Sequence, residues 1–205
     1  MRVLVTGGAG FIGTHVVTAL SRDGHTVTSL DLRTGSDPGV PGILADVRDP
    51  AAVTAALVGM DAVVHLAAKV GLERGLQDAH EYVLQNDGGT AVLLAAMERS
   101  GVGRLVLASS MVVYGEGLGR CGQHGPVRPG PRRQPDLDEG RGRPRTVLEL
   151  ATSLAAAAGA PAPLVTGRAR LADVRHITAS SERANSELGW RAREDFDASM
   201  VELLG

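Results

Sequence analysis

The chain has 205 residues, of which 43% are hydrophobic and 21% charged, with a formal net charge of −2. This composition excludes wholesale disorder, and the near-neutral charge gives no long-range attraction to nucleic acid or to an anionic membrane surface. One cysteine excludes an internal disulfide and a four-cysteine zinc site. Because no apolar run reaches about 18 residues and the first residues lead straight into a strand-like run, we expect a cytoplasmic protein without a membrane span.

Over the first 109 residues, short apolar runs alternate with segments of helical periodicity, which is the pattern of a parallel sheet with crossover helices. We therefore predict an α/β fold with a Rossmann-type, doubly wound parallel sheet of at least five strands in the order 3-2-1-4-5, followed by a reduced C-terminal helical lobe. The predicted strands span Arg2–Thr6, Thr26–Asp31, Gly42–Ala45, Asp61–Ala67 and Leu105–Ser109.

Three helices are predicted to connect these strands. The first has an apolar face that extends to Leu20, and the second begins at Asp49-Pro50, an N-cap carboxylate followed by proline at the first helical position. The third is predicted as one long helix over Glu81–Ser100. The residues of this helix predicted to face the core are Leu84, Ala91, Leu94 and Ala95.

The regular pattern stops after residue 115. Residues 115–145 contain eight glycines, five prolines and seven arginines without a periodic apolar run, which predicts a polar loop. Helical periodicity returns over Val147–Leu154, Ser181–Leu188 and Phe196–Leu204, and Leu164–Thr166 is a candidate short strand. We predict a Rossmann domain over 1–115, a Gly/Pro/Arg-rich loop over 116–145 and a reduced C-terminal lobe over 146–205.

A glycine-rich turn joins the first strand to the first helix. Thr6–Gly13 satisfies both GxxGxxG and GxGxxG, in which glycines permit a tight turn, let the backbone approach a pyrophosphate and allow close packing of helix on strand. Asp31 ends the second strand 18 residues after Gly13, where a carboxylate accepts hydrogen bonds from an adenosine ribose and repels a 2′-phosphate. This favours NAD over NADP, although the nearby Arg33 is of a type that accommodates that phosphate. The alternative is a turn without a ligand and a solvated strand end.

Several further motifs occur in the order found in one protein family. They are Asp46–Asp49, His65–Ala68, Asn86 with Gly89-Thr90, Ser109–Gly115, Asp173–His176 and Glu187–Trp190. With the glycine turn and Asp31, they make the sequence resemble an extended short-chain dehydrogenase/reductase of the NAD-dependent nucleotide-sugar epimerase/dehydratase family. Within that family it is most similar to the epimerases that act on dTDP-sugars. The resemblance covers roughly residues 1–142 and about 146–205.

The resemblance implies a role for each matching residue, with NAD as cofactor and a nucleotide-diphosphate sugar as substrate. Ser110 matches the catalytic hydroxyl that hydrogen-bonds the reacting sugar oxygen, and Arg170 and Asp173 match contacts to the substrate diphosphate. The implied cofactor-binding residues are Gly7, Gly10, Phe11, Ile12, Gly13, Asp31, Asp46, Val47, Ala67, Ala68, Lys69, Asn86 and Ser109. The alternative for Asp46, Asn86 and Ser110 is ordinary capping or loop hydrogen bonding, and for Arg170 and Asp173 a solvated surface pair.

One catalytic element of that family is absent. Hydride transfer there uses a Tyr-x-x-x-Lys pair, in which the lysine charge lowers the tyrosine pKa from about 10 toward neutrality. Tyr82 is followed at the fourth position by Asn86 and Tyr114 by Leu118, and the sole lysine is Lys69. Because family members are longer and the motifs on both sides are present, we expect an internal shortening with its seam near Arg141–Arg145.

Cys121-x-x-His124 resembles what remains of a metal knuckle present in some of these epimerases. Two ligands fall short of the four of a closed zinc site, so no metal is predicted. A mobile polar loop is the favoured interpretation of this segment.

Three functions are compatible with these features. The first is an NAD-binding member of the family whose hydride transfer is impaired or lost. The second is an enzyme recruited to a non-redox reaction, an elimination, cyclisation or hydrolysis, that uses Ser110. The third is a non-catalytic binding or regulatory partner of a full-length relative. The fifth strand presents an unpaired edge, which we expect a second copy or a full-length relative to cover, unless Leu164–Thr166 supplies a further strand. The resemblance implies a homodimer through Glu81–Ser100.

Overall fold

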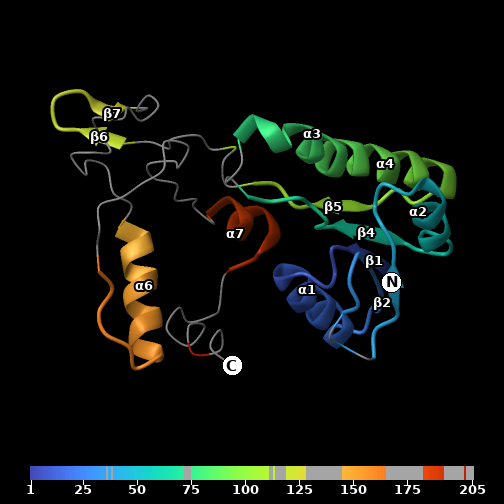
Figure 1. Cartoon of the computed structure of the whole chain (residues 1–205), viewed down its shortest axis with the longest axis horizontal. Coiled ribbons are helices and arrows are strands. Elements are labelled where there is room, and N and C mark those ends of the chain that lie inside the picture. Colours follow the sequence, from blue (N-terminus) through green and yellow to red (C-terminus); the bar gives the residue numbers. More distant parts are fainter. Residues whose placement is uncertain are drawn as a thin grey trace. The chain divides into compact units, whose positions relative to one another are not determined.

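The computed structural model describes residues 1–35, 37, 39–71, 75–110, 113, 119–127, 145–164, 182–191 and 201. The chain divides into two compact units, Met1–Ser109 and Ser110–Gly205. The first unit contains a parallel sheet with its helices, and the described residues of the second contain a short hairpin and further helices (Figure 1).

Five parallel strands form the sheet of the first unit in the order β3-β2-β1-β4-β5, which confirms the predicted topology. The strands are β1 (Arg2–Thr6), β2 (Thr26–Asp31), β3 (Gly42–Leu44), β4 (Ala62–His65) and β5 (Leu105–Leu107). The central strand β1 pairs with β2 on one side and β4 on the other. Because all five strands run parallel, their carboxyl ends meet at one edge of the sheet.

Crossover helices lie on both faces of this sheet (Figure 1). Helix α1 (Phe11–Arg22) links β1 to β2, and α2 (Pro50–Ala56) links β3 to β4. The Asp49 carboxylate caps α2 by accepting from two backbone N–H groups of its first turn, where Pro50 also lies, as predicted. The connection from β4 to β5 contains the 3-10 turn η1 (Gly75–Asp78), α3 (Ala79–Tyr82), the π-helix η2 (Val83–Gly88) and α4 (Gly89–Ser100).

Alternate residues of β1 supply two separate core clusters, one on each face of the sheet. Val3 and Val5 pack with Val17 of α1 and Val27 of β2. Leu4 points to the opposite face, because successive side chains of a strand alternate. Its cluster there consists of Leu30, Val47, Val53, Ala56, Leu57, Val63, Leu93, Ala96, Met97 and Val102.

The segment predicted as one helix over Glu81–Ser100 is instead interrupted by the π-helix η2, and its predicted core face was wrong. The buried side chains of α4 are Leu93, Ala96 and Met97, which have the i, i+3, i+4 spacing of a helix stripe. The residues predicted to be buried, Leu84, Ala91, Leu94 and Ala95, are all exposed. Since every residue over Ala91–Met97 is apolar, the sequence pattern does not set the phase of this helix; packing against α2 does.

In the second unit, a β-hairpin lies where the sequence predicted only a loop. Strand β6 (Gly119–Cys121) pairs antiparallel with β7 (Gly125–Val127), and Gly125 has a φ of +71°, which glycine adopts without strain. Helices α6 (Arg145–Ala157) and α7 (Glu182–Leu188) match two predicted helical segments. The strand predicted at 164–166 and the helix predicted at 196–204 lie largely outside the described residues.

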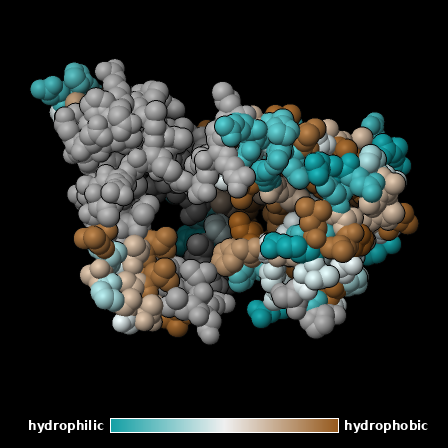
Figure 2. Space-filling model, in the orientation of Figure 1, coloured by the Kyte–Doolittle hydropathy of each residue, from teal (hydrophilic) through white to brown (hydrophobic). Residues whose placement is uncertain are grey.

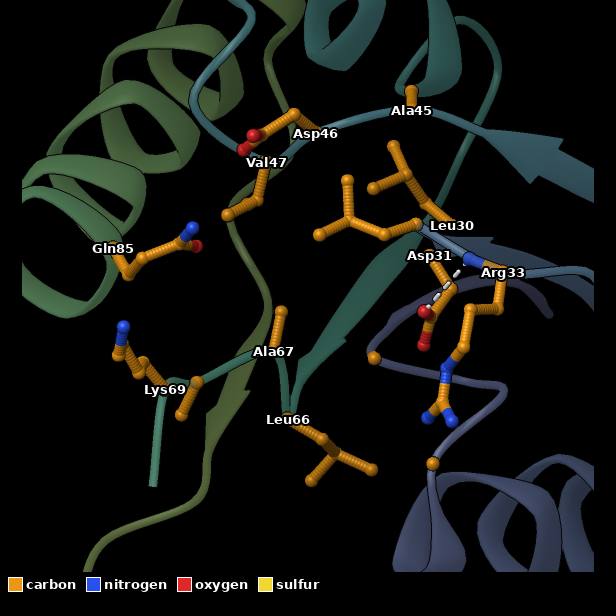
Figure 3. A pocket seen from close by; sticks show the side chains of 14 residues that line it. Leu30, Asp31, Arg33, Ala45, Asp46, Val47, Leu66, Ala67, Lys69 and Gln85 are labelled. Carbon is orange, nitrogen blue, oxygen red and sulfur yellow. Dashed lines mark hydrogen bonds between the residues drawn. The ribbon is translucent and has the colours of Figure 1, made fainter. Parts of the chain in front are cut away.

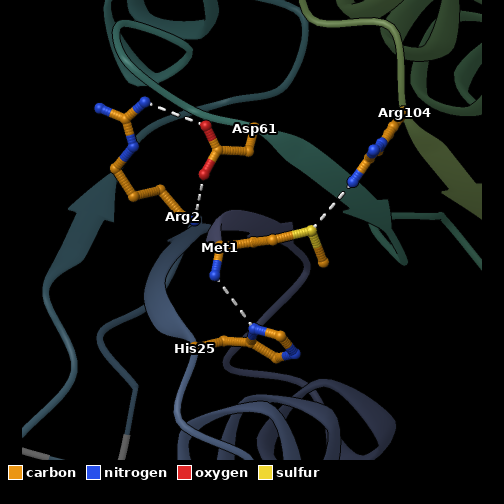
Figure 4. Close-up of polar contacts among 5 residues, drawn as sticks. All are labelled: Met1, Arg2, His25, Asp61 and Arg104. Atoms are coloured by element: carbon orange, nitrogen blue, oxygen red, sulfur yellow. Dashed lines mark hydrogen bonds and ion pairs between the residues drawn. The ribbon is translucent and has the colours of Figure 1, made fainter.

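An ion pair ties the start of β1 to the residue before β4 (Figure 4). The Arg2 guanidinium donates to Asp61 Oδ1 at 3.0 Å, and the Arg2 backbone N–H donates to Asp61 Oδ2 at 2.7 Å. These two hydrogen bonds lower the pKa of the Asp61 carboxyl to about 2.

We expect Asp61 to account for part of the acid sensitivity of folding. Since its pKa is about 2 in the folded chain and 3.8 ordinarily, the carboxylate stabilises the fold above about pH 4 and loses this contribution as the pH falls toward 2. Asp61→Asn should lower the free energy of unfolding at pH 7 and flatten its dependence on pH below about 4, measured by urea titration. Asp23→Asn, at an exposed helix end, is the control. If the free energy of unfolding of Asp61→Asn fell below pH 4 as steeply as that of wild type, this assignment would be contradicted.

Candidate functional site

The glycine turn between β1 and α1 is packed too closely to accept larger residues. Gly7 has a φ of +72°, and its N–H donates to Leu30 O at 2.8 Å. A Cβ on Gly13 would lie 2.0 Å from Gly7 O, and a Cβ on Gly7 would lie 2.7 Å from Ala67 N. The turn therefore brings the start of α1 against the end of β1 and presents bare backbone at the carboxyl edge of the sheet.

A cleft of about 430 Å³ opens at this edge (Figure 3). Its walls are the end of β2 with the residues that follow it, the residues that follow β3 and β4, the glycine turn and one residue of η2. The lining residues are Gly7, Gly10, Leu30, Asp31, Leu32, Arg33, Ala45, Asp46, Val47, Leu66, Ala67, Ala68, Lys69 and Gln85. A crevice beyond the carboxyl ends of the strands is where doubly wound sheets bind their ligands.

Asp31 connects the glycine turn to the wall of the cleft at the end of β2. Its Oδ2 accepts from the Ala9 N–H and its Oδ1 from the Arg33 N–H, both at 3.1 Å. Each carboxylate oxygen has a second lone pair for a donor on a ligand. The Arg33 side chain extends along the same wall, as Figure 3 shows. This wall thus offers a carboxylate to a hydroxyl and a guanidinium to an anion.

Asp46 follows β3 and carries a cationic partner of its own. The Arg48 guanidinium donates to both carboxylate oxygens, with Nη2 2.6 Å from Oδ2, and the Arg48 N–H donates to Oδ1 at 2.8 Å. The guanidinium holds the pKa of the Asp46 carboxyl below its usual range, so this side chain stays ionised. Next to it, Val47 contacts Gly89 of α4, where a Cβ would lie 2.7 Å from Val47 Cγ1.

Asn86 of η2 holds the segment after β4 through the backbone of one residue. The Lys69 N–H donates to Asn86 Oδ1 at 2.8 Å, and Asn86 Nδ2 donates to Lys69 O at 3.1 Å. The Lys69 ammonium pairs with Glu81 and lies 5.5 Å from the centroid of the Tyr82 ring. The sole lysine of the chain therefore lies at the cleft, with its charge balanced by a carboxylate of α3.

The structure brings most of the predicted cofactor-binding residues together. Those that line the cleft are Gly7, Gly10, Asp31, Asp46, Val47, Ala67, Ala68 and Lys69. The others lie elsewhere: Gly13 is buried beneath the turn, Phe11 and Ile12 are 70% and 64% exposed, Asn86 contacts Lys69, and Ser109 is exposed after β5.

The remaining predicted site residues lie outside this cleft or outside the described part of the chain. Ser110 is exposed and is the first residue of the second unit. Arg170 and Asp173 fall outside the described residues.

Six lining residues are not among the predicted cofactor-binding residues: Leu30, Leu32, Ala45, Leu66, Gln85 and Arg33, of which Arg33 was considered only for a 2′-phosphate. The first four adjoin a predicted residue at a strand end, so extending each motif by one position finds them. Gln85 reaches the cleft from η2, and the sequence carries no signal for it.

Within the described residues, no group of three or more His, Cys, Asp and Glu side chains is placed to hold a metal ion. Cys121 Sγ and His124 Nδ1 lie 3.3 Å apart in the hairpin. Over the same part of the chain, no helix combines the length and the apolar character needed to cross a membrane.

Comparison with known families identifies this arrangement. A family model described as the NAD dependent epimerase/dehydratase family matches residues 3–134. The chain belongs to this family. The matched segment of this epimerase/dehydratase family member includes every residue that lines the cleft, as well as Ser110.

The chain is similar to part of the length of two curated relatives. It is 41% identical over 116 residues to the 3 beta-hydroxysteroid dehydrogenase/Delta 5-->4-isomerase of Mycobacterium tuberculosis, covering 53% of this chain and 31% of that protein. It is 37% identical over 147 residues to the dTDP-glucose 4,6-dehydratase of Streptomyces niveus, covering 63% of this chain and 44% of that protein. The chain thus spans less than half the length of these relatives.

Among solved structures, the chain is similar to MoeE5 in complex with UDP-glucose and NAD, with 37% identity and a TM-score of 0.52 over 56% of this chain and 38% of that chain. An alignment with MoeE5 in complex with UDP-glucuronic acid and NAD has 26% identity and a TM-score of 0.74, and covers 98% of this chain and 96% of that chain.

We expect Gly13→Ala to destabilise the chain by about 1–3 kcal/mol, because the added methyl group overlaps Gly7 O. This loss should appear even though alanine is the better helix former by about 1 kcal/mol. Gly103→Ala is the matched control, since nothing lies within 4 Å of its Cβ position. Urea unfolding measures both variants, and a Gly13→Ala variant as stable as Gly103→Ala would show that the turn is not closely packed.

Proposed function

We propose that this chain binds NAD in the cleft and that it has lost the hydride transfer of the family's epimerases and dehydratases. One observation supports the proposed NAD binding: the glycine turn, which has no bulky side chain, lies beside the Asp31 carboxylate. The loss of chemistry is carried by the absence of the Tyr-x-x-x-Lys pair from the sequence.

NAD fits the donors and acceptors that line this cleft. The N–H groups at the start of α1 and the positive end of its dipole would face the pyrophosphate across Gly7 and Gly10, which have no side chain. Asp31 would accept from the adenosine ribose hydroxyls through its unused lone pairs. Asp46 and Val47 would hold the adenine edge. The residues Ala67, Ala68 and Lys69 would line the rest of the groove.

The proposed loss of hydride transfer follows from the surroundings of the tyrosines. NAD, when bound, supplies a hydride acceptor, but the family's reaction also needs a base. Neither Tyr82 nor Tyr114 has a lysine four residues on, and the only lysine, Lys69, pairs with Glu81. The Tyr82 hydroxyl donates to Gly71 O at 2.9 Å. The Lys69 ammonium that lies 5.5 Å from the centroid of the Tyr82 ring has its charge balanced by Glu81. A tyrosine hydroxyl without an uncompensated cation beside it is a poor base at neutral pH.

We propose that the chain is shortened internally. One MoeE5 alignment covers 56% of this chain but only 38% of that chain, so MoeE5 is the longer of the two. The other alignment covers 98% and 96% of the two chains. An alignment that spans nearly all of two chains of unequal length contains a gap inside the shared span. This supports a lost internal segment, with the predicted seam near Arg141–Arg145.

A nucleotide-diphosphate sugar is the proposed second ligand. MoeE5 was solved with such sugars. By their resemblance to the family's motifs, Ser110, Arg170 and Asp173 of this chain would contact a ligand of this kind. In the alternative function, Ser110 would serve a non-redox reaction on a ligand of this kind.

We also propose that a second copy, or a full-length relative, covers exposed apolar surface of the first unit. Val83, Leu84 and Leu94 are 57%, 53% and 48% exposed on the segment over 81–100, and Val106 of β5 is 64% exposed. Figure 2 shows hydrophobic residues interrupting the hydrophilic surface of this unit. Burial of such residues favours association. Sedimentation should show a dimer, and a folded protein that stays monomeric at all concentrations would contradict this part of the proposal.

Titration of the purified protein with NADH, followed by fluorescence, should give a Kd in the micromolar range and weaker binding of NADPH. Asp31→Asn should weaken NADH binding about tenfold, because a charged hydrogen-bond acceptor is lost. It should also reduce the preference for NADH over NADPH, since the repulsion of a 2′-phosphate is lost. Asp23→Asn is the matched control. Wild-type protein that binds neither dinucleotide would overturn the proposed function.

We expect incubation with NAD and a panel of dTDP- and UDP-hexoses to yield NADH or epimer only very slowly. The rate should be at least about 10²–10⁴-fold lower than that of a relative that has the base. Absorbance at the NADH band and chromatography of the sugars measure the two products. Turnover at the rate of such a relative would contradict the proposed loss. If a non-redox product forms instead and Ser110→Ala abolishes it, the alternative function is established.

A further inference from the structure

Behind the wall of the cleft, three side chains form an uninterrupted hydrogen-bond chain from β1 through β4 to α4. Thr6 Oγ1 lies 2.5 Å from His65 Nδ1, and His65 Nε2 lies 3.1 Å from Thr90 Oγ1. Thr6 and His65 are 0% and 2% exposed. These three residues are not among those that line the cleft. We refer to Thr6, His65 and Thr90 as the buried relay.

The ends of the buried relay determine the direction of each hydrogen bond within it. The Thr90 hydroxyl donates to Asn86 O at 2.6 Å, so its oxygen accepts from His65, and His65 Nε2 carries the imidazole proton. His65 Nδ1 is then an acceptor, and the Thr6 hydroxyl donates to it. Thr6 Oγ1 in turn accepts from the Ala67 N–H at 3.3 Å. Burial lowers the pKa of His65, which keeps the ring neutral at neutral pH.

Both ends of the buried relay belong to segments that shape the cleft. Ala67 lines the cleft, and its N–H is held by Thr6. Asn86, whose carbonyl accepts from Thr90, holds Lys69 by two further hydrogen bonds. The backbone ladder already pairs Thr6 with His65, so the side chains are not needed to join β1 to β4. What they add is a fixed separation between the end of β4 and the helical segment η2–α4.

We propose that Thr6, His65 and Thr90 are positioning residues that set the affinity of the cleft for NAD by holding the wall at 67–69 against η2. This inference rests on the proposed NAD-binding function. Replacing the Thr90 hydroxyl by a methyl group keeps the shape of the side chain but leaves His65 Nε2–H without its acceptor. The ring or the π-helix must then shift, and Ala67 and Lys69 shift with it.

Thr90→Val should weaken NADH binding about tenfold, and Thr90→Ser, which restores the hydroxyl, should bind within about twofold of wild type. Thr54→Val is the matched control, because Thr54 Oγ1 donates to Pro50 O four residues earlier, as Thr90 does to Asn86 O, but on α2 and away from the cleft. Circular dichroism at the titration temperature verifies that all variants are folded. Equal NADH affinities for Thr90→Val and Thr54→Val overturn the inference.

Nitrogen NMR of histidine-labelled protein tests the proton order of the buried relay without any ligand. Wild type should show His65 with a protonated Nε2 and an unprotonated Nδ1, and Thr90→Val should lose this signature. Wild type that binds NADH but has a protonated His65 Nδ1 overturns this inference alone. Wild type that shows the expected His65 signature but binds no NADH overturns the proposed function instead.

Discussion

The close approach of α1 to the end of β1 is the constraint on which the rest of the site depends. At a separation of 2.0 Å between the Cβ position of Gly13 and Gly7 O, no side chain larger than hydrogen fits without displacing backbone. The same turn rests on the residues after β4, where a Cβ on Gly7 would meet Ala67 N. The two glycines therefore permit two close contacts. Gly13 lets the N-terminus of α1 lie against the end of β1, and Gly7 lets the residues after β4 lie against the turn. The Ala9–Asp31 hydrogen bond then connects the turn to the wall at β2.

The chain combines the scaffold of its family with the proposed loss of that family's hydride transfer. As a member of the NAD dependent epimerase/dehydratase family, it has the cleft at the expected edge of the sheet, with one acidic side chain at the end of β2 and another after β3. Binding a dinucleotide needs only backbone donors, a carboxylate and shape, all of which come from the first unit. Moving a hydride also needs a base matched to neutral pH, and that requires a cation beside a tyrosine hydroxyl. Here the one lysine is paired with Glu81.

Residues that do not line the cleft determine much of its shape. Asn86 acts on Lys69 through the backbone, Gly89 lets α4 approach Val47, and Thr90 continues the buried relay to His65 and Thr6. Three of these residues lie within five positions at the junction of η2 and α4. A π-helix at this junction changes the direction in which consecutive side chains point, which suits a segment that contacts two walls of one cleft.

The sequence by itself determined what depends on short-range stereochemistry: the apolar run of β1, the glycine turn and the Asp49-Pro50 helix start. The alternation of apolar runs with helical periodicity over residues 1–109 also predicted the doubly wound sheet and its strand order. It also placed the Asp31 and Asp46 carboxylates at strand ends, where parallel topology brings them to one cleft. Tertiary structure alone decided the buried face of α4, because an unbroken apolar run has no preferred phase until α2 packs against it. It alone decided that Asn86 holds Lys69, that Gln85 reaches the cleft and that residues 119–127 pair as a hairpin. These outcomes depend on which partner lies within hydrogen-bond or van der Waals distance, and that is a property of the folded chain rather than of any local pattern.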